Sequence, residues 1–123
     1  MMKVEVKLNA GALQRYVEAA KQAAVDTMQV VYTDLVSSRT MPFDEGDMQN
    51  NNTWVEQTEN GAVLITGSIQ ARRLYYHPEY NFKQSEGANG TRGAYWLEPY
   101  ISGDKKDFIR DKYIELFRRR TGL

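Results

Sequence analysis

The sequence predicts an α+β fold, with a long N-terminal helix packed on a small antiparallel β-sheet and a C-terminal amphipathic helix. Three observations carry this prediction: a long apolar stripe at helical spacing, two strand patterns joined by Asn60-Gly61, and a second helical stripe near the C-terminus. At 123 residues the chain has the usual length of one domain, so residues 1–123 are expected to share a single core.

The first element is expected to be a short edge strand over residues 3–8. Apolar and charged side chains alternate there, which is the period of a half-buried strand. The apolar positions are Val4, Val6 and Leu8, and the charged ones are Lys3, Glu5 and Lys7.

A long helix is predicted over residues 10–37. Asn9 is a suitable N-cap, and Pro42 favours an end to the helix before it, because proline disfavours helical angles in its predecessor. The small alanines of the stripe allow close packing on a neighbouring element. The stripe consists of Leu13, Val17, Ala20, Ala24, Met28, Val31 and Leu35.

The segment that follows the long helix is predicted to be an irregular loop that orders on assembly, because its acidic and Asn-rich composition buries little. The candidate residues of this assembly loop are Met41, Pro42, Phe43, Asp44 and Asp47. Asp44-Glu45-Gly46-Asp47 could in principle bind a hard cation, but a Ca²⁺ loop needs more oxygen ligands at regular spacing. A solvated turn is therefore expected, with no metal.

The middle of the chain is expected to form a β-hairpin. Strands are predicted over 53–58 and 62–70, and Asn60-Gly61 supplies the positive φ of a tight turn. A further strand is predicted over 72–77, closed by Pro78, followed by a flexible, glycine-containing stretch over 83–93.

A last helix is predicted after residue 104, with Asp104 or Ser102 as its cap. Its apolar stripe lies among charged residues with a mild positive excess, which is typical of a solvated amphipathic helix. The stripe consists of Phe108, Ile109, Tyr113, Leu116 and Phe117.

The composition argues against several classes of function. Sixteen Lys and Arg balance sixteen Asp and Glu, so no net charge favours wholesale binding to nucleic acid or to an anionic membrane. The absence of Cys and the presence of one His leave little for disulfide, thiolate, zinc or Ser-His-Asp chemistry. No apolar run suggests a signal peptide or a membrane span, so a soluble, untargeted protein is expected.

An enzyme is not expected. His77 could act as a base with Glu79 nearby, but no nucleophile stands beside it in the sequence, so a structural ring is favoured over a small hydrolase. Gly87, Gly90 and Gly93 lack the preceding strand and the Lys-Ser/Thr pair of a phosphate-binding loop. We therefore expect no catalytic residues and no cofactor.

Aromatic residues are concentrated between Tyr75 and Tyr100, where half of the two Trp, eight Tyr and four Phe lie. Tyr, Trp and Arg are enriched at interface hot spots, which favours a protein interface over a purely structural core. The same rings could instead stack on bases, with Arg72, Arg73, Lys83 and Arg92 on phosphates, in a nucleic-acid-binding module over 72–100. The interface candidates are Arg72, Arg73, Tyr75, Tyr76, Tyr80, Phe82, Tyr95, Trp96 and Tyr100.

Three segments in combination resemble the phage minor capsid proteins of long-tailed phages and prophages. They are Arg72-Arg73-Leu74-Tyr75-Tyr76-His77-Pro78-Glu79-Tyr80-Asn81-Phe82, Ala94-Tyr95-Trp96-Leu97-Glu98-Pro99-Tyr100 and Lys106-Asp107-Phe108-Ile109. The chain as a whole also resembles the wider neck or tail-completion family, in which a long helix precedes a polar loop and a small sheet. Pro42, Asp44 and Gly46 stand where that family's loop carries a Pro, an acid and a Gly.

The resemblance implies a structural protein of the virion neck, a head-tail connector or tail-completion protein assembled in the bacterial cytoplasm. Its implied partners are an adaptor or stopper ring and a tail terminator. It also implies a homo-oligomeric ring in the virion, no membrane and no catalysis. It leaves open a monomer when the protein is free, and contact with passing genomic DNA.

Overall fold

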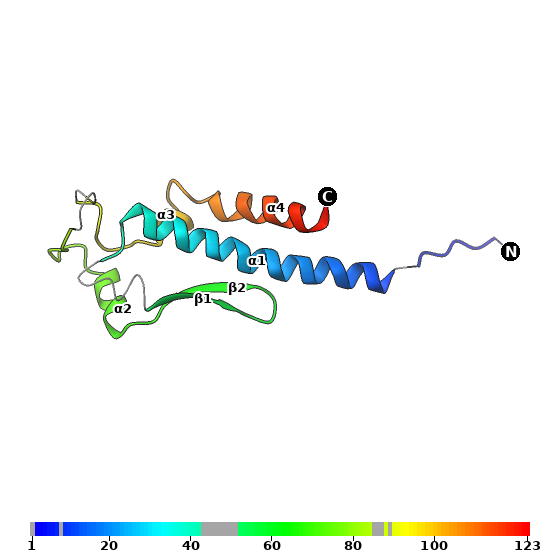
Figure 1. The fold of residues 1–123 in the computed structure, drawn as a ribbon, viewed down its shortest axis with the longest axis horizontal. Coiled ribbons are helices and arrows are strands. Elements are labelled where there is room, and N and C mark those ends of the chain that lie inside the picture. Colours follow the sequence, from blue (N-terminus) through cyan, green and yellow to red (C-terminus); the bar gives the residue numbers. More distant parts are fainter. Residues whose placement is uncertain (1, 8, 43–51, 85–87, 89) are drawn as a thin grey trace.

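The computed structural model describes residues 2–7, 9–42, 52–84, 88 and 90–123. Its elements are α1 (Ala10–Ser38), β1 (Thr53–Gln57), β2 (Ala62–Thr66), α2 (Ile69–Tyr75), α3 (Glu98–Ile101) and α4 (Phe108–Thr121). The long α1 lies between α4 on one side and the β1–β2 hairpin on the other (Figure 1). The predicted α+β class is confirmed, with its long first helix, small antiparallel sheet and C-terminal helix.

Helix α1 begins where the sequence predicts and ends one residue later. The Asn9 side chain accepts a hydrogen bond from the Ala12 N–H at 3.0 Å, which confirms the N-cap. At the other end Arg39 adopts left-handed angles with φ 54°, and its N–H donates to the Val36 carbonyl. This left-handed residue ends the helix before Pro42 is reached.

The core lies around the C-terminal half of α1. Val31 and Leu35 pack there with residues from the later part of the chain: Met41, Ala71, Trp96 and Tyr100. The predicted apolar stripe is buried in this half, but Leu13 and Val17 are 47% and 45% exposed. The first turns of α1 extend beyond the hairpin and α4 (Figure 1).

The predicted hairpin is confirmed, although its turn is not of the predicted kind. Thr53 pairs with Thr66 and Gln57 with Ala62, and the Thr58 N–H donates to the Gly61 carbonyl at 2.9 Å. The expected positive φ at Asn60-Gly61 is wrong, because Gly61 does not lie in the left-handed region.

Three strand predictions are wrong, one of them only at its end. The expected extension of the second hairpin strand to 70, and the expected strand over 72–77, are replaced by α2. Ser68 starts this helix by accepting a hydrogen bond from the Ala71 N–H at 3.0 Å. Residues 2–7 form no strand, and they are exposed because they pair with no described segment.

Helix α4 runs antiparallel to α1 and is fixed to it at both ends. Lys105, just before α4, lies 2.8 Å from Asp34, and Arg120 lies 2.7 Å from Asp26. The predicted caps Asp104 and Ser102 are wrong, because the helix begins after residue 107 and has no side-chain cap bond. No helix in the described part of the chain is long and apolar enough to cross a bilayer.

Candidate functional site

Four rings from two separate segments form an aromatic cluster: Tyr75, Tyr76, Tyr95 and Trp96. The Tyr75 ring makes edge-to-face contacts with the other three, at centroid distances of 5.1 Å to Tyr76, 5.5 Å to Tyr95 and 4.7 Å to Trp96. Such ring contacts stabilise the folded protein by more than the burial of their apolar surface alone. The sequence-predicted interface candidates are therefore brought together here in part.

The backbone positions this cluster. Tyr75 and Tyr76 end α2, and the Tyr95 N–H donates to the Tyr75 carbonyl at 3.1 Å. Tyr95 adopts left-handed angles with φ 55°, which a bulky side chain rarely does. The later segment is thus turned back against α2, and its rings meet those of the helix.

A cavity of about 380 Å³ opens beside the aromatic cluster. We call it the aromatic groove. Tyr75, Tyr76 and Trp96 line it, together with Arg72 of α2 and Glu98 and Ile101 of α3. The groove is thus mainly apolar, with one cationic residue, Arg72, and one anionic residue, Glu98, in its wall. An apolar pocket with a few polar groups is typical of binding sites in proteins.

The groove has a buried floor and an exposed rim. Trp96 is 2% exposed, whereas Tyr76 and Ile101 are 60% and 67% exposed. Two large apolar side chains in water beside a packed ring indicate a surface that a partner can cover. The Trp96 Nε1 is buried without a hydrogen-bond partner in the described part of the chain.

Tyr75 and Glu98 connect the two walls of the groove. The Tyr75 hydroxyl donates to Glu98 Oε1 at 3.2 Å. Burial and the hydrogen bond to this carboxylate raise the pKa of Tyr75 to about 12. The hydroxyl therefore stays protonated at neutral pH and acts as a structural donor.

Tyr100 belongs to the core, not to the groove. It is 7% exposed, and its hydroxyl donates to Asp34 of α1, which also accepts from Lys105. Burial and the Asp34 hydrogen bond raise the pKa of Tyr100 above its ordinary value of 10.0. This predicted interface candidate therefore anchors the chain around α3 to α1.

A second group of predicted candidates forms a separate surface stack. Arg73 Nε donates to the Tyr80 hydroxyl at 3.4 Å, and its guanidinium lies 5.6 Å from that ring's centroid. On the same ring His77 stacks at 4.7 Å. His77 Nδ1 and Glu79 Oε1 are 2.6 Å apart, and the hydrogen bond to His77 lowers the pKa of Glu79.

The His77–Glu79 pair lies outside the aromatic groove. Both side chains are exposed, at 43% and 64%, and neither lines the groove. A hydrolase centred on this pair requires a pocket that holds substrate against it. The geometry provides a hydrogen-bonded surface pair instead.

The remaining candidates lie in or near the core. Met41 and Pro42 are buried, and Phe82 is half-buried. Arg92, expected as a surface cation, is 5% exposed and donates from Nη1 to the Met41 carbonyl at 2.7 Å. Burial and the nearby Arg39 charge lower the pKa of Arg92. The other assembly-loop candidates, Phe43, Asp44 and Asp47, lie outside the described residues.

Part of the predicted flexible stretch over 83–93 is held in place. The Gln84 side chain accepts from the Arg92 N–H and donates to the Arg92 carbonyl, both at 3.0 Å. The Gly93 N–H donates to the Thr40 carbonyl at 2.9 Å. These bonds fasten the described residues at both ends of the stretch to each other and to the end of α1.

Sequence reasoning missed Glu98 and Ile101, which form the α3 wall of the groove. Pro99 stands at the start of this short helix, a position that proline favours, so the Glu98-Pro99 pair could have indicated it. The described residues contain no group of His, Cys, Asp and Glu side chains that could hold a metal ion. The expected absence of metal at residues 44–47 lies outside the described part.

Comparison of the chain with protein-family models, with curated proteins and with solved structures gave no match.

Proposed function

We propose that this chain is a structural component of the virion neck of a long-tailed phage or prophage. In this role it forms or completes the ring that joins the DNA-filled head to the tail. The sequence resemblance over 72–82 and 94–100 supports the proposal, and these two segments build the surface stack and the aromatic groove. The partners are neighbouring neck proteins, and assembly takes place in the host cytoplasm.

The observation that carries the proposal is the exposed rim of the aromatic groove. Tyr76 and Ile101 remain largely in water around a hollow whose floor is Trp96. Aromatic and arginine side chains around an apolar pocket are typical of hot spots in protein interfaces. An apolar side chain from a neighbouring subunit fits this hollow and would cover the rim.

The test is a charged substitution on the rim. Ile101→Asp places a carboxylate on an exposed position, so the fold is retained while an apolar interface is disrupted. We expect binding to the neighbouring neck proteins to weaken by about tenfold or more, and tail-bearing virions to become rare when the variant replaces the wild-type protein. Mass photometry of the mixture and electron microscopy of the virions measure these effects.

Ile114→Asp is the matched control, because Ile114 is 40% exposed on α4, away from the groove. We expect it to bind and assemble as the wild type does. Wild-type assembly by Ile101→Asp would contradict the groove as an interface. Absence of the wild-type protein from complete virions would contradict the neck function itself.

A nucleic-acid-binding function is the second candidate. The exposed stack of Arg73, His77 and Tyr80 favours it, because a ring beside a cation can hold a base and its phosphate. The buried Arg92 is not available for such a contact. Binding to single-stranded DNA that weakens steeply between about 50 and 200 mM salt, and that Arg73→Ala abolishes, would support it.

A further inference from the structure

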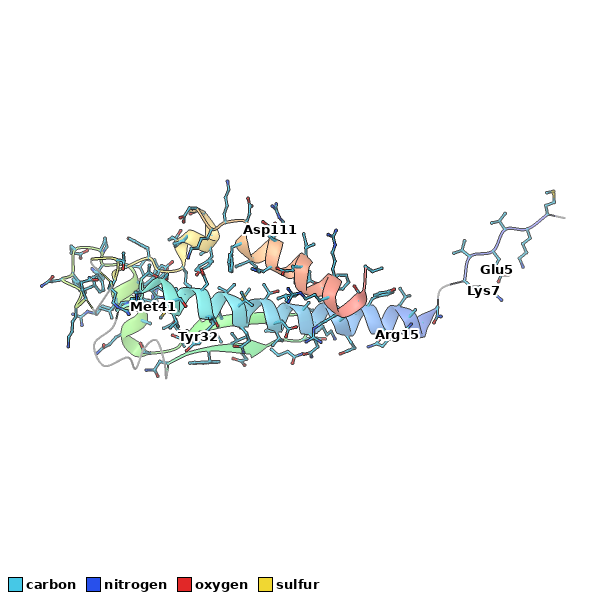
Figure 2. All side chains as sticks on the ribbon, turned by 45° about the horizontal axis from the view of Figure 1, so that its top comes forward. Glu5, Lys7, Arg15, Tyr32, Met41 and Asp111 are labelled. Carbon is cyan, nitrogen blue, oxygen red and sulfur yellow. The ribbon has the colours of Figure 1, made fainter. Side chains whose placement is uncertain are left out.

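Among the described residues, one extended segment of alternating apolar and charged residues pairs with no strand, and the sheet has only two strands. Residues 2–7, here called the N-terminal arm, leave α1 and run away from the rest of the molecule (Figures 1 and 2). In the arm, Val4 and Val6 are 95% and 83% exposed. The described sheet has two strands, so the outer edge of β1 pairs with no described strand.

The arm and the hairpin have matching patterns. In the arm Val4 and Val6 alternate with Lys3, Glu5 and Lys7. In β1 the side chains that face α1, such as Val55, alternate with outward ones that include Glu56. An arm that adds to this edge with its valines beside Val55 places Lys3, Glu5 and Lys7 on the outer face with Glu56. The arm then brings a net charge of one positive unit to the face that carries the Glu56 carboxylate. Opposite charges on neighbouring strands stabilise such a pairing.

The arm cannot pair with the hairpin of its own chain. The hairpin turn lies opposite Ala24, since a Cβ on Gly61 would be 3.9 Å from the Ala24 Cβ. Ala24 is about 21 Å along the helix from Ala10 at a rise of 1.5 Å per residue. A reversed arm reaching back from Asn9 to Met2 spans about 23 Å at most. Residues 2–9 therefore reach only as far as the turn, and these residues cannot lie along β1 of their own chain.

We propose that the N-terminal arm of one copy adds as a strand to the outer edge of β1 in a second copy of this chain. The backbone N–H and C=O groups of the arm then pair with those on the side of β1 that faces away from β2, as in other cases of strand addition. The donating arm and the accepting edge lie at different places on the molecule. The contact is therefore head-to-tail, which closes into a ring or continues as a filament, unless two copies exchange arms.

This inference deepens the proposed function, because it names a contact through which copies of the chain join. It stands on the arm and the hairpin, not on the aromatic groove. The two proposals can thus fail separately, and the test below uses the purified chain without any neck protein.

Disulfide cross-linking between two populations of the full chain tests the contact, and the absence of natural Cys removes any background. Lys3→Cys and Lys7→Cys are each mixed with Glu56→Cys at high protein concentration under mild oxidation. We expect a mixed disulfide dimer from at least one of these pairs. Asp111→Cys replaces Glu56→Cys as the control, since Asp111 lies exposed on α4 (Figure 2), and should cross-link at least tenfold less.

A proline variant identifies the contact as strand pairing. Neighbouring residues of a strand point their N–H groups in opposite directions, so Glu5→Pro with Val6→Pro removes one donor from the paired side. We expect this double variant to abolish the cross-link, whereas Glu5→Gln with Val6→Ile, which keeps both N–H groups and the pattern, retains it. Equal cross-linking to residues 56 and 111, no cross-linking at all, or an undiminished cross-link in the proline variant would overturn the proposal. Cross-linking in a protein that proves absent from virions would leave it standing while the neck function fails.

Discussion

Asp34 connects three parts of the chain through one carboxylate. It lies on α1 and accepts hydrogen bonds from the Tyr100 hydroxyl and from the Lys105 ammonium, which lies 2.8 Å away. Burial raises the pKa of Asp34, but the two hydrogen bonds and the Lys105 charge outweigh it, so the pKa lies below its ordinary value of 3.8. The charged carboxylate is thus favoured by folding.

This residue should make stability depend on pH in the acid range. Because folding lowers the pKa, the contribution of Asp34 is fully present above pH 3.8 and is lost as the pH falls through the folded pKa. Asp34→Asn should lower the free energy of unfolding at pH 7 by about 1–3 kcal/mol and should make the loss of stability at low pH shallower. Urea unfolding between pH 7 and about pH 2 measures both effects. An unchanged pH profile in the variant would contradict this role.

At the scale of elements, α3 and the start of α4 are joined by a turn with no room for a side chain. A Cβ on Gly103 would lie 2.7 Å from the Pro99 Cα and 3.4 Å from the Glu98 carbonyl oxygen. The Gly103 N–H also donates to that oxygen at 3.0 Å. The turn holds α3, and with it the Ile101 rim of the aromatic groove, close to α4.

Gly103→Ala should therefore destabilise the protein by about 1–3 kcal/mol, because the backbone of Pro99 must move away from the added methyl group. Thermal and urea unfolding measure this loss. The control is Gly61→Ala in the hairpin turn, where the nearest atoms are 3.9 Å from the new Cβ, and its effect should stay within about 0.5 kcal/mol. Equal losses of stability in the two variants would contradict this prediction, because they would show that the backbone at Pro99 moves away from the added methyl group at no cost in free energy.

The sequence predicted those elements whose pattern is local and whose ends are capped. Asn9 and the apolar stripe identify α1, and the two strand patterns identify the hairpin. It failed for residues 3–8, because alternation predicts an edge strand but not whether a partner strand is within reach. It also failed for 72–77, where the aromatic residues favour a strand and the Ser68 cap gives a helix.

The sequence predicted which residues belong to the candidate site but not which of them are buried and which are exposed. Local composition indicated that the rings of 75–100 belong together, yet it could not separate Tyr76 on the rim from Trp96 on the floor or Tyr100 in the core. That separation depends on contacts with α1, more than 60 residues away in the sequence for the Tyr100–Asp34 pair. Such long-range packing leaves no periodic signal in a short segment.

At the scale of the whole molecule, the packing is uneven along α1. The half of the helix that ends at Ser38 packs in the core, while Leu13, Tyr16 and Val17 in its first turns are 47%, 42% and 45% exposed. A helix of this length gains most of its stability from tertiary packing. The first turns therefore belong to the part of the chain that opens most easily.

Amide hydrogen exchange should show this gradient directly. We expect the amides of residues 14–20 to exchange at least tenfold faster than those of residues 27–35, because opening the first turns exposes little of the core. Mass spectrometry of peptides from the two ends of α1 measures the difference in a dilute sample. Equal protection along the helix would contradict the gradient.

The two tryptophans are intrinsic fluorescent probes, one on each of the two proposed contact surfaces. Trp54 is 42% exposed on the hairpin, and Trp96 is 2% exposed at the floor of the groove. Trp54→Phe leaves an emission that reports on the groove and the core, and Trp96→Phe leaves one that reports on the hairpin. A shift of the Trp54 emission toward the blue on assembly would report that the hairpin loses water. Trp96 is already buried, so coverage of the groove should change the intensity of its emission and its access to a soluble quencher, not its wavelength.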